Sequence, residues 1–177
     1  HKPMVLATGI ATEEDIQLAV EACRRMGNND ITVLKCTSSY PAPVEEANLC
    51  MIRDLAERFQ VKSGLSDHTL GSVSPIVAVI QGASMIEKHF ILNRSIGGPD
   101  CSFSMEEKDF AQMVKDVRMA ELSLGKTTYE LTEKMRGSRS ASRSLYVAED
   151  MKAGEVITER NVRSVRPGFG LHPKYPV

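Results

Sequence analysis

The sequence predicts an α/β fold in which parallel strands alternate with helices, followed by a smaller second module. Three observations lead to this prediction. The first 124 residues repeat one unit, a short apolar strand that ends on small polar residues and is followed by an amphipathic helix. The segment Ile31–Leu34 has the continuous apolar character of a parallel strand that is buried on both faces. After Gly125 the composition changes to a basic, serine-rich stretch.

Four strands are expected in the first part of the chain. They are Met4–Thr8, Ile31–Cys36, Val61–Leu65 and Ser84–His89. Parallel neighbours need a crossover connection of a dozen or more residues, and the segments between these strands have that length. The spacing therefore predicts a parallel sheet built through right-handed crossovers.

A helical pattern follows each strand. The four expected helices are Glu13–Met26, Val44–Phe59, Val73–Gln81 and Met105–Leu124. Thr12 is the expected N-cap of the first helix and Gly27 ends it. Ser104 and Gly125 are expected to do the same for the last helix.

Two architectures fit four such units. A TIM barrel contains eight units in roughly 250 residues, so the chain forms either a small open sheet or the second half of a barrel. It opens at His1–Pro3 directly into a strand, without an initiator methionine or a signal-peptide segment. This start favours the half barrel and indicates a piece of a longer protein.

The tail is expected to be a separate module. We predict a half-barrel domain at 1–134, a linker at 135–143 and a second domain at 144–177 that begins with the strand Ser144–Val147. From residue 135 onward there are 8 Lys and Arg and 4 Asp and Glu, whereas the first 134 residues carry 14 and 19. These opposed net charges, +4 and −5, favour docking of the tail onto an acidic body in the same or another subunit.

The composition excludes several classes of protein. The 177 residues are 42% hydrophobic with a net charge of −1, which excludes a disordered chain and the basic excess of a dedicated nucleic-acid binder. The longest apolar run, Ile76–Ile80, is far shorter than the roughly 20 residues of a membrane span. The four cysteines have no C-x-x-C spacing, so we expect reduced thiols and a cytoplasmic location.

Two histidines follow neighbouring strands of the expected sheet. His68 and His89 are one crossover apart, and active sites of α/β proteins gather at the carboxyl ends of parallel strands. Neutral imidazole is a common ligand of transition metals, so the pair is a candidate metal site open to substrate. Asp67 and Glu87 are candidate third ligands or partners of the ligands. The alternative is that each histidine only caps a neighbouring loop.

Hydroxyls and lysines lie at the same strand ends. Thr37, Ser38 and Ser66 stand at the level where barrels bind phosphate, although such residues also end strands as helix caps. Lys35 and Lys88 point either into the barrel, where a Schiff base could form, or toward the helices. We expect structural or electrostatic roles for both lysines.

Several strings resemble, in order and spacing, the sialic acid synthase family. In the first part of the chain they are Cys36–Pro41, Gly64–Thr69, Glu87–Phe90 and Gly98–Asp100. The tail strings Arg143–Leu145 and Arg163–Tyr175 are similar to the antifreeze-like (SAF) domain of these enzymes, and the second is most similar to the pseudaminic branch. The resemblance covers essentially the whole chain.

The resemblance implies the second half of a TIM (β/α)8 barrel followed by the start of a SAF domain. It implies a transferase that condenses phosphoenolpyruvate with an open-chain acetamido sugar, in a homodimer whose tail reaches over the partner's barrel. In the pseudaminic branch the sugar is a diacetamido-trideoxy hexose and the products are pseudaminic acid and phosphate. N-acetylneuraminate and legionaminic acid are the alternative products.

The resemblance also implies roles for seven residues. They are the metal ligands His68 and His89, the phosphate contacts Ser38 and Ser66, the amino-sugar contacts Tyr40 and Asp100, and the tail residue Arg166, which reaches the partner's site. The ion, Mn²⁺, Mg²⁺ or Co²⁺, would polarise the aldehyde oxygen. Ala7 departs from the family, which often has a serine there that contacts phosphoenolpyruvate. The family's first four barrel units carry an essential Glu and the phosphoenolpyruvate lysines, so we expect no catalysis from this chain alone.

Two interpretations of other classes remain open. One is a Schiff-base aldolase that uses Lys35 or Lys88, which borohydride trapping with pyruvate would reveal. The other is a non-catalytic carbohydrate- or protein-binding scaffold, which would bind its ligand without metal dependence.

Overall fold

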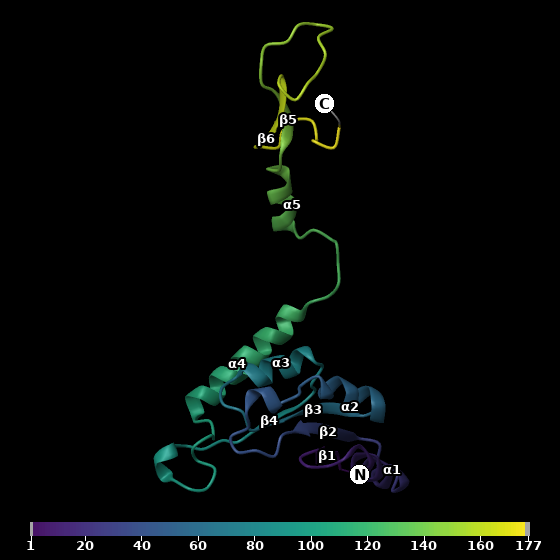
Figure 1. Cartoon of the computed structure of the whole chain (residues 1–177), viewed down its shortest axis with the longest axis vertical. Coiled ribbons are helices and arrows are strands. Elements are labelled where there is room, and N and C mark those ends of the chain that lie inside the picture. Colours follow the sequence, from purple (N-terminus) through teal and green to yellow (C-terminus); the bar gives the residue numbers. More distant parts are fainter. Residues whose placement is uncertain (1, 176–177) are drawn as a thin grey trace. The chain divides into compact units, whose positions relative to one another are not determined.

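The computed structural model describes residues 2–175 in two compact units, the first ending at Gly125 and the second beginning at Lys126. Unit 1 contains a four-stranded parallel sheet in the order β1-β2-β3-β4 (Figure 1). The strands are β1 Met4–Ala7, β2 Ile31–Cys36, β3 Lys62–Asp67 and β4 Ile86–Lys88. Neighbours in the chain are neighbours in the sheet, as expected for consecutive strand–helix units.

Four helices alternate with the strands. They are α1 Glu13–Arg25, α2 Met51–Phe59, α3 Val73–Ile80 and α4 Glu107–Leu124. The start of α1 is as predicted: the Thr12 hydroxyl accepts a bond from the Asp15 backbone N–H, and the Asp15 carboxylate accepts one from the Thr12 N–H. This reciprocal pair satisfies two N–H groups that the helix itself leaves free.

The helices pack on one face of the sheet. Val33 contacts α1 and α2, Leu65 contacts α2 and α3, and Ile86 contacts α3 and α4 in three apolar clusters. Because side chains alternate along a strand, the residues at even positions of β2 and β3 point to the opposite face. This alternation decides which strand-end residues share a surface.

Two predicted helix starts are wrong. The helix expected from Val44 is a 3₁₀ turn, Val44–Glu46, and Asn48 then adopts a left-handed conformation (φ 46°) before α2 begins. The helix expected after Ser104 begins two residues later, after Glu106. The Ser104 hydroxyl instead donates to the Asp100 carbonyl oxygen, 2.7 Å away, inside the preceding loop.

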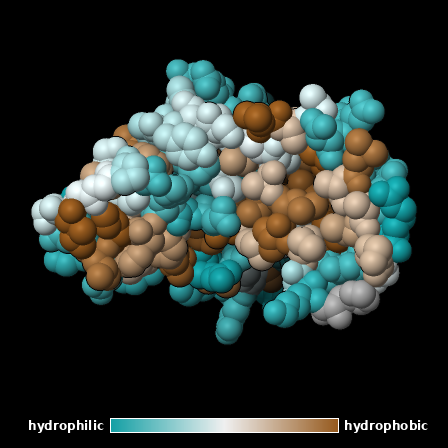
Figure 2. Space-filling model, turned by 90° about the horizontal axis from the view of Figure 1, so that it is seen from below, coloured by the Kyte–Doolittle hydropathy of each residue, from teal (hydrophilic) through white to brown (hydrophobic). Residues whose placement is uncertain are grey.

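The sheet has two open edges among the described residues, because β1 and β4 each pair with a single strand. Large apolar side chains are also exposed on unit 1, including Ile10, Leu92 and Ile96. Figure 2 shows hydrophobic residues gathered into patches on the face that it draws. Open edges and apolar patches of this kind favour association.

Unit 2 consists of α5 Glu133–Ser140 and an antiparallel pair, β5 Ser144–Val147 and β6 Val162–Val165. The strand at β5 has the bounds that the sequence predicts. Most of the segment expected as a linker is the helix α5, whose N-cap Thr132 accepts a bond from the Met135 N–H. Within residues 2–175, no helix is long and apolar enough to cross a membrane.

Candidate active site

The two histidines meet at the carboxyl ends of β3 and β4. The strands pair Ser66 with Glu87 and Asp67 with Lys88, so the next two residues, His68 and His89, come opposite each other. Their ring centroids are 5.1 Å apart and the rings are inclined at 67°. The two rings share one rim, as the sequence predicts.

His68 is held by the residue that follows the neighbouring strand β2. Its ring is buried, and Nδ1 lies 2.8 Å from the Thr37 carbonyl oxygen. A carbonyl oxygen only accepts hydrogen bonds, so Nδ1 carries the proton and the lone pair of Nε2 is left for a ligand. An N–H···O=C bond of this kind is the usual support of a metal-bound histidine.

His89 is more exposed than His68. Its Nδ1 lies 3.7 Å from an oxygen of Asp100, in the loop after β4. In the described part of the chain, no three His, Cys, Asp or Glu side chains are grouped so that they could hold a metal ion. Among these residues, an ion at this rim would have the two imidazoles as its protein ligands and its remaining positions open to water or substrate.

Asp67 and Glu87 are not placed as third ligands. The Lys88 ammonium donates to Asp67 Oδ2 at 2.5 Å, and the Ser66 hydroxyl donates to Glu87 Oε1 at 2.7 Å. Both carboxylates thus connect β3 to β4 directly beside the histidines. Of the two roles expected for them, the structure favours support of the ligands over ligation.

Two aromatic rings border the histidine pair. The Tyr40 ring centroid is 4.4 Å from that of His68, and the Phe103 centroid is 4.9 Å from that of His89. Phe103 is buried, whereas Tyr40 is exposed and free to meet a ligand. Phe103 is not predicted from the sequence, because it lies in an irregular loop where no periodic pattern marks it. Its nearness to Asp100 in the chain is the one signal that could have pointed to it.

The other predicted site residues lie at increasing distance along the chain from the pair. Ser66 is buried two residues before His68. Ser38 follows β2, and a Cβ on Gly9 would lie 3.1 Å from its hydroxyl oxygen, so Gly9 (φ 47°) leaves room for it. Arg166 belongs to unit 2 and directly follows β6.

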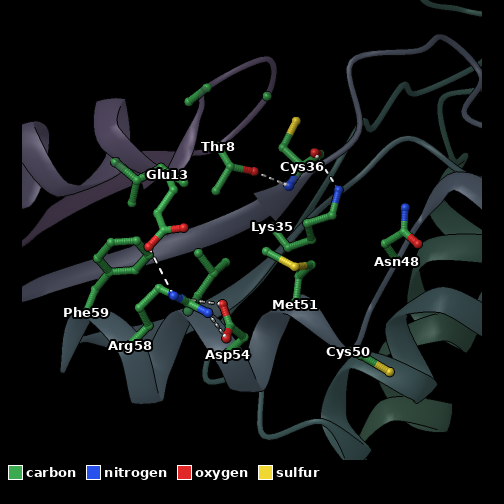
Figure 3. A pocket seen from close by; sticks show the side chains of 14 residues that line it. Thr8, Glu13, Lys35, Cys36, Asn48, Cys50, Met51, Asp54, Arg58 and Phe59 are labelled. Carbon is green, nitrogen blue, oxygen red and sulfur yellow. Dashed lines mark hydrogen bonds and ion pairs between the residues drawn. The ribbon is translucent and has the colours of Figure 1, made fainter.

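Lys35 points toward the helices, on the same side of β2 as Val33. It lines a cavity of about 710 Å³ between α1 and α2, together with Thr8 and Met51 (Figure 3). Its ammonium donates to the Cys36 carbonyl oxygen at 2.8 Å, and burial lowers the pKa of Lys35. Neither histidine lines this cavity.

A parallel α/β sheet with functional side chains at the carboxyl ends of its strands is the arrangement of α/β-barrel domains, and comparison with known proteins makes this class specific. The profile of the NeuB family matches residues 1–129 and that of the SAF domain matches residues 142–176. The chain belongs to the NeuB family.

Among curated relatives, the pseudaminic acid synthase of Helicobacter pylori is 49% identical over 176 residues, which are 99% of this chain and 52% of that protein. The N,N'-diacetyllegionaminic acid synthase of Legionella pneumophila is 33% identical over 97% of this chain and 49% of that protein. The chain spans about half the length of the curated relatives it matches.

Two solved structures share the fold. The sialic acid synthetase of Leptospira borgpetersenii has a TM-score of 0.69 and 31% identity over 77% of this chain and 48% of that one. The spore coat polysaccharide biosynthesis protein SpsE of Bacillus subtilis has a TM-score of 0.68 and 32% identity over 98% of this chain and 54% of that one. The predicted α/β class, half a TIM barrel followed by a SAF domain, is confirmed.

Proposed function

We propose that the protein containing this chain is a phosphoenolpyruvate-dependent synthase of nonulosonic acids, and that its product is pseudaminic acid. The observation that carries this proposal is the pair His68 and His89 at the joined ends of β3 and β4. The choice of product rests on identity, which is 49% to a pseudaminic acid synthase and 33% to a legionaminic acid synthase.

The proposed reaction joins three carbons to six. C3 of phosphoenolpyruvate attacks the aldehyde carbon of open-chain 2,4-diacetamido-2,4,6-trideoxy-L-altrose, and the aldehyde oxygen takes up a proton. Water adds at C2, and phosphate leaves with cleavage of its C–O bond. The products are a nine-carbon 2-keto acid and inorganic phosphate.

In this proposal the residues of unit 1 orient the aldehyde. A divalent ion held by His68 and His89, Mn²⁺, Mg²⁺ or Co²⁺, would supply Lewis-acid polarisation of the oxygen that gains charge. The Thr37 carbonyl keeps the His68 ring in the required tautomer. Asp100, beside His89, accepts hydrogen bonds from the sugar, and the exposed Tyr40 contacts it next to His68.

The phosphate contacts assigned to this chain are Ser38 and Ser66. The Ser66 hydroxyl donates a hydrogen bond to Glu87, so it can donate one to phosphate only after the bond to Glu87 is broken. Arg166 of a partner subunit completes the sugar contacts in the proposed homodimer. The match to the relatives covers only about half of their length. In this proposal the barrel units in their other half supply the remaining phosphoenolpyruvate contacts, so we expect no turnover from this chain alone.

The proposal is tested on the natural protein that contains this chain. Incubation with phosphoenolpyruvate, the altrose derivative and Mn²⁺ should release phosphate and a nine-carbon keto acid, detected by mass spectrometry, and EDTA should stop both. His89→Ala should abolish turnover while the control Gln17→Ala, on the exposed side of α1, retains it. Wild-type turnover and Mn²⁺ affinity in His89→Ala would contradict the assignment.

The same assay separates the competing functions. Turnover with N-acetylmannosamine but not with the altrose derivative would replace the proposed product by N-acetylneuraminate. A borohydride-stable adduct with pyruvate would favour the aldolase. Sugar binding by calorimetry that is equal with and without Mn²⁺, without phosphate release, would favour a non-catalytic scaffold.

A further inference from the structure

A buried ion pair joins β3 and β4 one residue before the two histidines, and the proposed chemistry does not use it. Lys88 Nζ and Asp67 Oδ2 are 2.5 Å apart, and the two side chains are only 2% and 1% exposed. The two residues are partners in the register of β3 and β4. Each of them immediately precedes one of the histidines.

The ion pair also fixes the backbone on both sides of His68. Lys88 donates a second bond to the Thr69 carbonyl oxygen at 2.6 Å, and Asp67 Oδ1 accepts from the Thr69 N–H at 2.9 Å. The residues before and after His68 are therefore both held by Lys88. Thr69 is connected onward, because its hydroxyl donates to that of Ser74 in α3.

Three successive cross-strand pairs result at this end of the sheet. Ser66 and Glu87 are hydrogen-bonded on the face away from the helices, and Asp67 and Lys88 are ion-paired on the helix-covered face. The third pair is the two imidazoles. Since side chains alternate, the imidazoles return to the face of Ser66. The ion pair therefore acts on them through the backbone, because Lys88 and Asp67 hold the residues on both sides of His68.

Stability alone does not explain a buried charge pair at this position. Removing two charges from water costs free energy that their attraction only partly restores, and apolar replacements of such pairs are often neutral or stabilising. What an apolar pair cannot reproduce is the directed contact from one ammonium to Asp67 and Thr69 together. The arrangement fixes geometry rather than adding much stability.

We propose that Asp67 and Lys88 are positioning residues that hold the imidazoles of His68 and His89 at a fixed separation, so that both can bind the same divalent ion. This inference rests on the proposed function for the ion itself, but the fixed separation is a property of the metal-free protein. Partners of metal ligands typically change metal affinity by about 10- to 100-fold when they are replaced.

The test uses Lys88→Met, Asp67→Asn and the double variant in the natural protein that contains this chain. Each single variant leaves one uncompensated buried charge, so both should lower the thermal unfolding temperature and weaken Mn²⁺ binding in calorimetry. The double variant should regain the unfolding temperature but keep an Mn²⁺ affinity about 10- to 100-fold below wild type. Recovery of stability and Mn²⁺ affinity together would overturn the proposal. If a single variant does not fold, the double variant still decides.

A matched control lies at the other end of β3. Lys62 and Asp30 form an ion pair of 2.9 Å that is largely exposed and far along the strand from the histidines. The double variant Asp30→Asn and Lys62→Met makes the same two substitutions, Asp to Asn and Lys to Met, in an exposed ion pair. It should leave both the unfolding temperature and the Mn²⁺ affinity close to wild type, since exposed pairs contribute little.

A second measurement needs no metal. The His68 Nδ1 proton, bonded to the Thr37 carbonyl, should give a slowly exchanging resonance in NMR spectra of the metal-free protein labelled with ¹⁵N-histidine. The resonance should be lost in the Asp67 and Lys88 double variant and kept in the surface control. If the wild type binds no Mn²⁺, the proposed metal site fails, yet this resonance still decides the positioning role: its persistence in the double variant would overturn it.

Discussion

Unit 1 and unit 2 of this chain achieve their folds by different means. Unit 1 buries three apolar clusters between its sheet and its helices. In the described part of unit 2, the two buried residues are polar, Ser144 and Asn161, and Asn161 bonds both the Thr158 N–H and the Val156 carbonyl oxygen. Unit 1 is thus organised by apolar burial, and unit 2 by backbone and side-chain hydrogen bonds.

The apolar side chains of unit 2 remain on its surface. Tyr129, Val156 and Phe169 are each at least three-quarters exposed. Unit 2 therefore leaves large apolar side chains in contact with solvent, whereas unit 1 packs apolar side chains into three buried clusters. The difference between the units teaches that unit 1 holds the candidate site on an apolar framework of its own, whereas the exposed apolar side chains of unit 2 lead us to expect that it acts against another surface.

The strongest way to test this contrast is to separate the contributions of the two units to one active site. His68→Ala and Arg166→Ala should each inactivate the natural protein that contains this chain. When the two variants are mixed and subunits exchange, a heterodimer contains one site with native His68 and native Arg166 only if the arginine acts on the partner's barrel. Activity, measured as phosphate release, should then reappear.

The guanidinium matters here because it presents fixed planar donors to sugar acetamido or hydroxyl oxygens. Arg166→Ala should therefore weaken use of the amino sugar far more than use of phosphoenolpyruvate. Heterodimers that are verified by mass but show no activity would place Arg166 in its own subunit's site, or in a structural role at the turn that follows it.

The second test concerns association of the 177-residue chain itself. Its two open strand edges and the hydrophobic patches of Figure 2 should make it self-associate. Light scattering should report a mass above the 19.5 kDa of one chain. A monodisperse 19.5 kDa species with cooperative unfolding would instead indicate a self-sufficient open sheet.

The third test compares one apolar side chain from each unit. Leu55 of α2 is fully buried against α1 and the sheet, so Leu55→Ala should lower the free energy of unfolding by about 2–5 kcal/mol. Phe169 is 80% exposed, so Phe169→Ala should change it by less than about 0.5 kcal/mol. Urea denaturation measures both. A large loss in Phe169→Ala would show that unit 2 does bury this ring against a surface.

The sequence predicts those parts of the fold that depend on local apolar patterns. The bounds of β2 are as predicted because Ile31–Cys36 is buried almost throughout. The end of β3 is not, because Ser66 and Asp67 continue the strand through contacts with Glu87 and Lys88 in β4. Polar residues whose side chains bond a neighbouring strand have the sequence pattern of a loop, so the end of such a strand is predicted too early.

The same division holds for the candidate site. The spacing of His68 and His89 predicts their meeting because one crossover and strand register determine it. The position of Phe103 depends on the path of an irregular loop, and the break before α2 depends on the left-handed Asn48, and neither leaves a periodic signal. Metal ligation by the histidines and the substrate contacts of the other residues stay predictions.

The smallest expected effect compares one helix cap from each unit by its contribution to the free energy of unfolding. Thr12 caps α1 in unit 1 and Thr132 caps α5 in unit 2, each by accepting a backbone N–H bond at the third helical residue. Thr12→Ala should lower the free energy of unfolding of unit 1 by about 1 kcal/mol, whereas Thr132→Ala should leave it unchanged and reduce only the helicity of α5.

The Thr12 cap also predicts a pH dependence. The hydrogen bond from Thr12 lowers the pKa of Asp15 below 3.8, so its contribution to stability is present above that pH and declines as the pH falls through the lowered pKa. Acid titration of unfolding should therefore show a smaller loss below pH 3.8 in Thr12→Ala than in wild type, and the Thr132→Ala profile should match wild type. Equal profiles in all three proteins would mean that the cap of α1 does not contribute to the stability of unit 1.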